Sequence, residues 1–140
     1  DTIYRGAAAK EIAKDKIYYI KRGEILQTDD VKILCFGGAD DPTDDLFSDN
    51  VPNEKDFENC LGNLEKADGQ VDYIITHSPS GRTVRFLDLN SNATGATLDF
   101  LDILQSKARY KKWYFGCSHK DKYISPKMQA VYEEVYKLGE

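Results

Sequence analysis

The sequence predicts a mixed α/β fold, in which a mixed β-sheet carries helices on one face. Short runs rich in β-branched and aromatic residues alternate with stretches whose apolar residues recur at helical spacing. The first runs are joined by short polar turns, as in antiparallel strands, and the later ones alternate with helices, as in parallel sheets. At 140 residues and 15.9 kDa the chain is expected to form a single domain, residues 1–140.

The amino-terminal part is expected to hold a short helix followed by strands. Residues 5–14 are rich in alanine, which favours a helix by composition. Three runs then have the composition of strands, at Ile17–Ile20, Glu24–Gln27 and Val31–Phe36. The short turns between them predict antiparallel pairing.

An acidic segment follows at residues 40–58, with eight carboxylates against a single lysine. Prolines predict that its first part is a loop. Asn53, with Asp56 three residues later, is typical of a helix amino terminus. Apolar residues at helical spacing extend that predicted helix from residue 57 to residue 67.

The remaining elements alternate in type. Val71–Thr76 predicts a buried strand, and a helix is expected from Thr94, with its apolar face formed by Leu98, Leu101, Leu104 and Ala108. Residues 111–115 predict another strand. The stretch from Lys122 to Leu138 fits either a final hairpin or a strand followed by a helix, and the pattern does not separate the two.

Composition and charge narrow the class of protein. The net charge of −5 argues against direct binding to nucleic acid or to an anionic membrane surface, and no apolar run is long enough to span a bilayer. Three widely spaced cysteines without C-x-x-C spacing are typical of reduced thiols. With no secretory leader visible, a cytoplasmic protein is expected.

Both histidines follow an apolar strand and open a polar loop. His77 comes directly after the strand that ends at Thr76, and Cys117 and His119 follow the strand that ends at Phe115. If the two strands are neighbours, His77, Cys117 and His119 could converge, and imidazole and thiolate are suitable ligands for zinc or iron. The alternative is two polar loop histidines and a structural cysteine.

These segments resemble the calcineurin-like metallophosphoesterase family. The run VDYIITHSP (71–79) is similar to that family's strand ending in Thr-His, and WYFGCSH (113–119) is similar to its strand followed by G-H-x-H. The segment from Ile33 to Asp40 resembles its strand that leads into Gly-Gly-Ala and an acidic loop. The resemblance covers most of residues 16–138 and implies the C-terminal half of the family's α/β sandwich, which stacks two sheets.

For function, the resemblance implies a metal-dependent phosphoester hydrolase, from which this sequence departs. His77 and His119 match metal-ligand positions, and Cys117 stands where the family has a histidine, so a divalent metal (Mn, Zn or Fe) is the cofactor implied. The family's D-x-H, G-D-x-x-D and G-N-H motifs, which supply most of its metal ligands, do not occur in this sequence. Without a bridging carboxylate a two-metal mechanism is not expected.

Three hypotheses therefore stay open. The first is a truncated, non-catalytic homologue that acts by protein binding, such as a phage-type inhibitor of a nucleic-acid-processing partner. The second is a phosphoesterase whose N-terminal half is supplied by another chain or lies upstream of Asp1. The third is a module that binds a single metal ion.

Two charged groups and one surface are candidates for binding. Asp40, Asp41, Asp44 and Asp45 could form an acidic patch that docks on a basic partner. Arg82 and Arg85, close to His77, could face a phosphate. Half of a two-sheet sandwich also leaves one sheet face bare, so we expect a homodimer or a complex with a protein partner.

Overall fold

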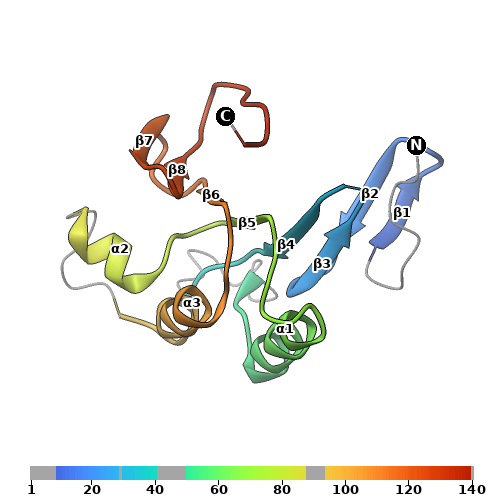
Figure 1. Ribbon diagram of the computed structural model, residues 1–140, viewed down its shortest axis with the longest axis horizontal. Coiled ribbons are helices and arrows are strands. Elements are labelled where there is room, and N and C mark those ends of the chain that lie inside the picture. The colour runs from blue at the N-terminus through green and yellow to red at the C-terminus, as the bar shows by residue number, and fades with distance from the viewer. Residues whose placement is uncertain (1–8, 29, 41–49, 88–93, 140) are drawn as a thin grey trace.

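A six-stranded mixed β-sheet forms the centre of the fold (Figure 1). The computed structural model of the chain describes residues 9–28, 30–40, 50–87 and 94–139. In spatial order the strands of the sheet are β3 (Glu24–Gln27), β4 (Lys32–Phe36), β5 (Tyr73–Thr76), β6 (Lys112–Phe115), β8 (Met128–Ala130) and β7 (Lys122–Ser125). The predicted mixed α/β class is confirmed.

The four inner strands are parallel and the two edge strands are antiparallel to them. Helix α1 (Glu54–Lys66) connects β4 to β5, and helices α2 (Gly81–Phe86) and α3 (Ala96–Lys107) connect β5 to β6. Because successive crossovers advance in one direction across the sheet, they return on the same side. Figure 1 shows α1 and α3 side by side beneath the sheet.

The main core lies between the sheet and these two helices. Alternate residues of the strands face the helices, among them Leu34, Ile74 and Trp113, which are all fully buried. They pack against Leu64 of α1 and Leu104 of α3. The indole nitrogen of Trp113 donates a hydrogen bond of 2.7 Å to Thr76 Oγ1, so its polar group is satisfied inside the core.

Two of the three predicted helices, those over residues 53–67 and from residue 94, are confirmed in position. Asn53 accepts hydrogen bonds from the first turn of α1, and Asp56 accepts one of 3.0 Å from the Asn53 backbone, which completes a capping box. The second predicted helix corresponds to α3 and buries Leu101 and Leu104, as its spacing predicts. Among the described residues, no helix is long and apolar enough to cross a membrane.

The amino-terminal helix prediction is wrong. Residues 9–20 form a separate antiparallel hairpin of β1 (Ala9–Ala13) and β2 (Ile17–Ile20), with Asp15 in the left-handed region at its turn. The rest of the predicted helix, residues 5–8, lies outside the described residues. Pairing with the strongly β-forming Ile-Tyr-Tyr-Ile run overrides the helix propensity of alanine.

Of the two alternatives predicted for the carboxyl-terminal end, the structure has the hairpin. Strands β7 and β8 pair antiparallel, and within residues 131–139 there is no helix. The sequence predicts a polar loop from residue 77 to residue 81 and no helix directly after it, whereas the structure has the short helix α2 there. Ser80 caps this helix, since its hydroxyl accepts a hydrogen bond of 3.3 Å from the backbone amide of Thr83.

Candidate functional site

The loops after β5 and β6 meet at the carboxyl ends of these two strands. The sequence predicts this arrangement if the two strands are neighbours, which they are. The backbone carbonyl of His77 accepts hydrogen bonds from the amides of Gly116 at 3.0 Å and Cys117 at 2.9 Å. Neighbouring parallel strands deliver both loops to the same edge. The two segments that carry the histidines are therefore joined through their backbones.

The side chains of these loops do not assemble into a metal site. Among the described residues, no three His, Cys, Asp or Glu side chains form a set that could hold a metal ion. The imidazole of His119 stacks on the ring of Tyr132, with centroids 5.3 Å apart, and His119 itself has a positive φ of 48°. The predicted ligand set of His77, Cys117 and His119 is thus not formed in this structure.

Cys117 makes a contact of its own with the loop after β5. Burial raises the pKa of its thiol, and a hydrogen bond with Ser78 offsets this only in part. Because Ser78 follows β5 and Cys117 follows β6, this hydrogen bond also joins the two loops.

Asp40, the first residue of the predicted acidic patch, makes a structural contact. Its carboxylate accepts hydrogen bonds from the backbone amides of Thr97 at 2.8 Å and Leu98 at 3.3 Å, at the amino terminus of α3. Gly95 precedes this turn with a φ of 157°, and a side chain there would collide with Asp40. Asp40 therefore caps α3, whose own N-cap residue provides no side chain. The other residues of the predicted patch, Asp41, Asp44 and Asp45, lie outside the described residues.

The two arginines of the predicted phosphate site have different surroundings. Arg85 forms an ion pair of 3.1 Å with Asp102 of α3, so its charge is already matched. The backbone amide of Arg82 donates to the same carboxylate at 2.8 Å. The Arg82 side chain instead lines a pocket beside α2.

The helix-free face of the sheet is largely apolar, as predicted. We use this name for the face formed by Ile33, Cys35, Tyr73, Ile75 and Tyr114. Cys35, Ile75 and Tyr114 stand side by side in register across β4, β5 and β6. Ile75 is 40% exposed although it lies on a central strand. Burial raises the pKa of Cys35 to about 11.

The C-terminal segment, residues 131–139, crosses part of this face. The backbone amide of Gly139 donates a hydrogen bond of 3.0 Å to the Tyr114 hydroxyl, and Tyr73 and Tyr114 are both buried. Asp121 fixes the start of the segment by accepting from the amides of Tyr132, Glu133 and Glu134. The expectation of a bare face is therefore corrected: the segment covers the two tyrosines and leaves Ile75 partly open.

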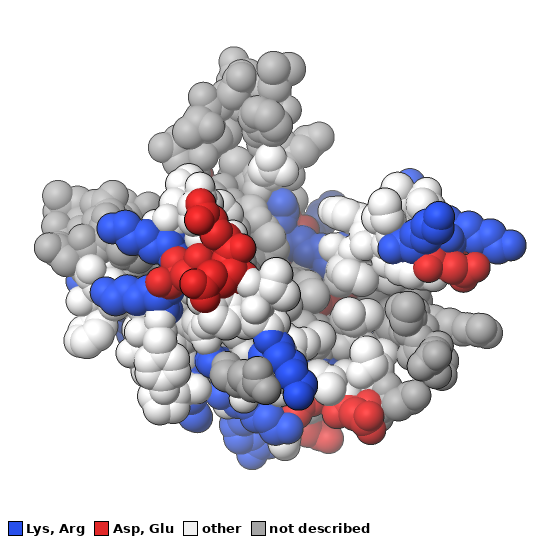
Figure 2. Space-filling model, turned by 90° about the horizontal axis from the view of Figure 1, so that it is seen from above, with Lys and Arg blue, Asp and Glu red and all other residues white. Residues whose placement is uncertain are grey.

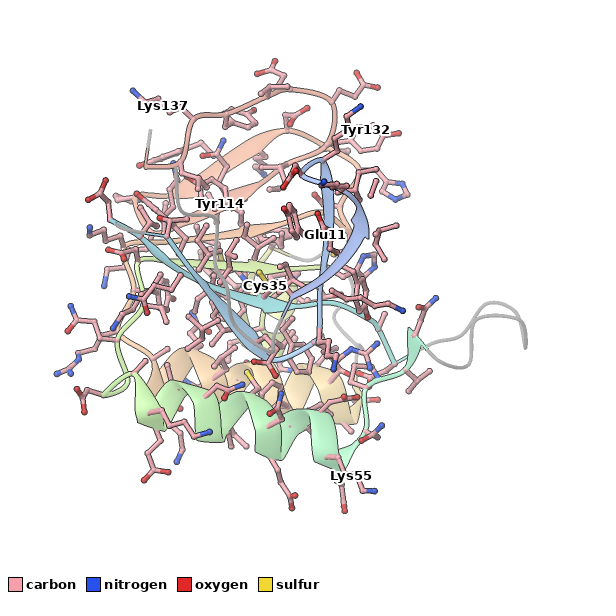
Figure 3. All side chains as sticks on the ribbon, turned by 90° about the vertical axis from the view of Figure 1, so that its right-hand side faces the viewer. Glu11, Cys35, Lys55, Tyr114, Tyr132 and Lys137 are labelled. Carbon is pink, nitrogen blue, oxygen red and sulfur yellow. The ribbon has the colours of Figure 1, made fainter. Side chains whose placement is uncertain are left out.

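The covering segment itself exposes apolar residues among its charged ones. Val135 is 99% exposed, and Tyr132 and Leu138 are also exposed. Exposed apolar residues occur on the β1–β2 hairpin as well, at Ile12, Ile17 and Tyr19. Figure 2 shows the C-terminal segment and the hairpin as two raised parts with a hollow between them. In Figure 3, Tyr132 and Lys137 of the C-terminal segment lie above Tyr114, and Cys35 lies lower, below Glu11 of the hairpin.

Sequence reasoning missed two features of this region. In the sequence, Asp121 resembles any surface carboxylate, because the three backbone amides that donate to it lie more than ten residues away. The pocket beside α2 combines residues from four elements, and no local pattern marks it.

Comparison with known proteins gives no relative. No protein-family model, curated protein or solved structure matches the chain.

Proposed function

We propose that this chain is a protein-binding module that is non-catalytic on its own and pairs, sheet against sheet, with a second copy through its helix-free face. One observation carries the proposal: Ile75, in the middle of a central strand, is 40% exposed on the face that no helix covers. An apolar side chain at such a position is normally buried by a second layer.

The exposed apolar residues supply a driving force for pairing. Ile75, Tyr132, Val135 and Leu138 are all exposed on or beside this face. Full burial of such a side chain contributes roughly 1.5–3 kcal/mol, from which the entropy cost of association must be subtracted. Large contiguous exposed apolar patches mark interaction sites on proteins.

The charges at the two sides of the face favour a second copy as the partner. The hairpin carries Lys10, Lys14 and Lys16 against Glu11 and Asp15, and the C-terminal segment carries Glu133 and Glu134 against Lys137. In a two-fold pair whose axis crosses the line between these two parts, the hairpin of one copy faces the C-terminal segment of the other. The excess positive charge then lies against the excess negative charge.

The resemblance to the calcineurin-like phosphoesterases supports the same geometry. That family stacks two sheets face to face with helices outside, and this chain has one sheet with helices on one side only. A second sheet on the helix-free face would complete the arrangement.

Light scattering at micromolar concentration, with a pair of matched variants, tests the proposal. The native chain is expected to have a mass of about 32 kDa, twice 15.9 kDa. Ile75→Lys should shift it to 15.9 kDa, whereas Ile103→Lys, at a 45% exposed position on α3, should leave the dimer intact. A native mass of 15.9 kDa without binding of a hydrophobic dye would contradict the proposal.

The backbone hydrogen bonds between the loops of the two histidines favour a second candidate function. Because it holds the loops of both histidines at one edge, the chain could be half of a phosphoester hydrolase that another chain completes. That chain must bring all the carboxylates, since this one offers no ligand set among its described residues. Hydrolysis that appears only on adding such a chain would support this candidate over the first.

A further inference from the structure

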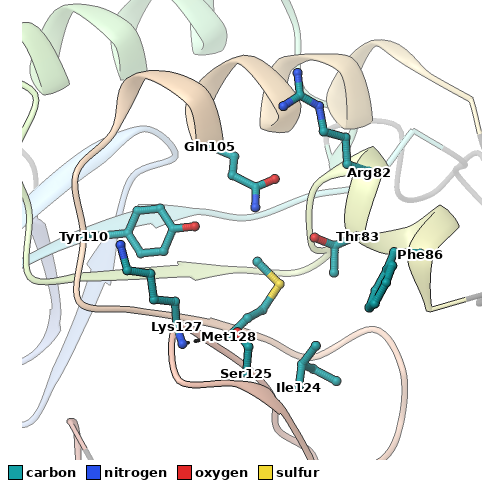
Figure 4. Close-up of a pocket in the computed structure, with 9 residues that line it drawn as sticks. All are labelled: Arg82, Thr83, Phe86, Gln105, Tyr110, Ile124, Ser125, Lys127 and Met128. Atoms are coloured by element: carbon teal, nitrogen blue, oxygen red, sulfur yellow. Dashed lines mark hydrogen bonds between the residues drawn. The ribbon is translucent and has the colours of Figure 1, made fainter.

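A pocket of about 590 Å³ lies away from the helix-free face, between α2, the end of α3 and the β7–β8 hairpin (Figure 4). Met128 of β8 and Ile124 of β7 form its apolar base, and Phe86, at the end of α2, forms one wall and is 83% exposed. Pockets that bind small organic molecules have volumes of roughly 300–1,000 Å³ and combine an apolar lining with a few fixed polar groups. This pocket has the size and the apolar part of such a site.

The polar part of the lining belongs to a chain of hydrogen bonds that runs in one direction. The Ser80 hydroxyl has one hydrogen, which it donates to Gln105 Oε1 at 2.6 Å. In the 3.0 Å contact between the hydroxyls of Ser80 and Thr83, Thr83 is therefore the donor. Gln105 in turn hydrogen-bonds to the phenol of Tyr110, and this bond lowers the pKa of Tyr110, as a bond donated by the Gln105 amide does. The chain thus begins at Thr83 and ends at the Tyr110 hydroxyl.

Two hydrogens at the end of this chain are left for a ligand. The Tyr110 O–H and the second N–H of the Gln105 amide have no acceptor among the described residues. Burial raises the pKa of Tyr110 more than the bond from Gln105 lowers it, so the hydroxyl keeps its hydrogen at neutral pH. Figure 4 shows the amide nitrogen of Gln105 and the Tyr110 hydroxyl on the same side of the pocket, above Met128. Because unpaired donors are costly where water is partly excluded, the pocket favours a ligand with an acceptor.

The two cations that line the pocket are directed elsewhere. The Lys127 ammonium lies 5.6 Å from the centre of the Tyr110 ring, and Figure 4 shows it away from the hydroxyl of that ring. The Arg82 guanidinium lies on the opposite side of the pocket and points away from it. No carboxylate occurs among the described residues that line the pocket. The space between the two donors and Phe86 therefore meets no charge, which favours an uncharged ligand.

From this combination we infer that the pocket binds a small uncharged aryl carbonyl compound, such as an aromatic amide. Its carbonyl oxygen accepts from the Tyr110 hydroxyl and the Gln105 amide, and its ring lies against Met128 and Phe86. A flat ring suits this place, since both the thioether of a methionine and a phenyl ring make favourable contacts with aromatic rings. The site is independent of pairing through the helix-free face, which shares no residue with this pocket.

Benzamide is the probe, and the Met128 methyl group is the reporter. The chain contains a single methionine, so one NMR signal reports on the base of the pocket. On titration with benzamide this signal should shift with a Kd on the order of 1 mM, a usual affinity for so small a ligand. Toluene, which lacks the carbonyl group, and acetamide, which lacks the ring, should each bind at least about fivefold more weakly. Benzoate, which keeps the ring but is charged, should also bind more weakly than benzamide.

Variants separate the donors from the apolar lining. Tyr110→Phe keeps the ring and removes the O–H, so the affinity for benzamide should fall about fivefold while that for toluene stays unchanged. Tyr123→Phe removes a hydroxyl from a 61% exposed tyrosine of β7 outside the pocket, and this matched control should bind benzamide as the native chain does. Phe86→Ala should weaken both benzamide and toluene. An unchanged indole N–H signal of Trp113 shows that each variant is folded.

Three results overturn the inference. The first is no shift of the Met128 signal at about 20 mM benzamide, roughly twenty times the expected Kd. The second is equal affinity for benzamide in Tyr110→Phe and in the native chain. The third is benzoate binding more tightly than benzamide, which would show that the cations and not the two donors select the ligand.

Discussion

At the residue scale, Asp40 shows how far local sequence reasoning extends. The capping box of Asn53 and Asp56 spans three residues and is visible in the sequence. The cap that Asp40 gives to Thr97 and Leu98 spans more than fifty residues, so the sequence shows only one acid among many. The same limit applies to Arg85, whose partner Asp102 comes from another helix.

Replacing Asp40 by alanine should lower the free energy of unfolding by about 1 kcal/mol, the usual contribution of a helix cap. The reason is that two backbone amides at the start of α3 lose their acceptor. Urea denaturation followed by the fluorescence of the single buried tryptophan, Trp113, measures the change. Glu58→Ala, at an exposed position in the middle of α1, is the control. Equal stability of the two variants would show that Asp40 is not a cap.

The isolated chain should not hydrolyse phosphate esters. No three potential ligands gather among the described residues, and His119 is stacked on Tyr132. Assays with p-nitrophenyl phosphate and its bis-ester, with manganese, nickel or zinc added, should give the rate of the metal alone. Turnover above that blank, abolished by His119→Ala, would show that a metal site exists.

At the element scale, strands and long helices follow from the sequence, and short or competing elements do not. The strands predicted at residues 17–20, 24–27 and 31–36 are present, and β-branched and aromatic residues are most frequent in the first of them. The alanine-rich stretch forms β1 instead of the predicted helix, because its backbone pairs by hydrogen bonds with the neighbouring strand β2. Helix α2 has six residues, fewer than a periodic pattern needs to be visible.

The C-terminal segment should detach from the helix-free face in acid. Backbone hydrogen bonds, that from Glu133 first, hold the pKa of Asp121 below its usual range. A carboxyl with a lowered pKa stabilises the fold above its unfolded value, about 3.9, and this contribution is lost as the pH falls through the folded pKa. The protection of the Tyr132, Glu133 and Glu134 amides, measured as their exchange rate relative to that of an unstructured peptide at the same pH, should therefore be lost below about pH 4 while amides of β5 stay protected.

Asp121→Ala should produce the same local exchange at neutral pH, because the acceptor is then absent at every pH. Slow exchange of the three amides in this variant would mean that other contacts hold the segment.

At the scale of the whole molecule, the fold class and the helix-free face could be predicted from the sequence. The C-terminal segment that covers part of this face could not. Successive apolar residues on three strands already indicate burial on both faces, whereas two helices can cover one. The path of residues 131–139 depends on Asp121 and on the hydroxyl of Tyr114, contacts that no pattern in that segment reveals. The meeting of the two histidine loops could be predicted from the neighbouring parallel strands, but the stacking of His119 on Tyr132 could not, because Tyr132 lies in the segment whose path no pattern reveals.

The most direct test of pairing through the helix-free face is an isotope-filtered NOE experiment. A mixture of labelled and unlabelled copies reports only contacts between different molecules. We predict intermolecular contacts at the Ile75 methyl groups, on the helix-free face, and none at the Ile103 methyl groups on α3. Intermolecular contacts confined to Ile103, or none at a concentration of several hundred micromolar, roughly the upper range at which a functional pair must form, would contradict the account.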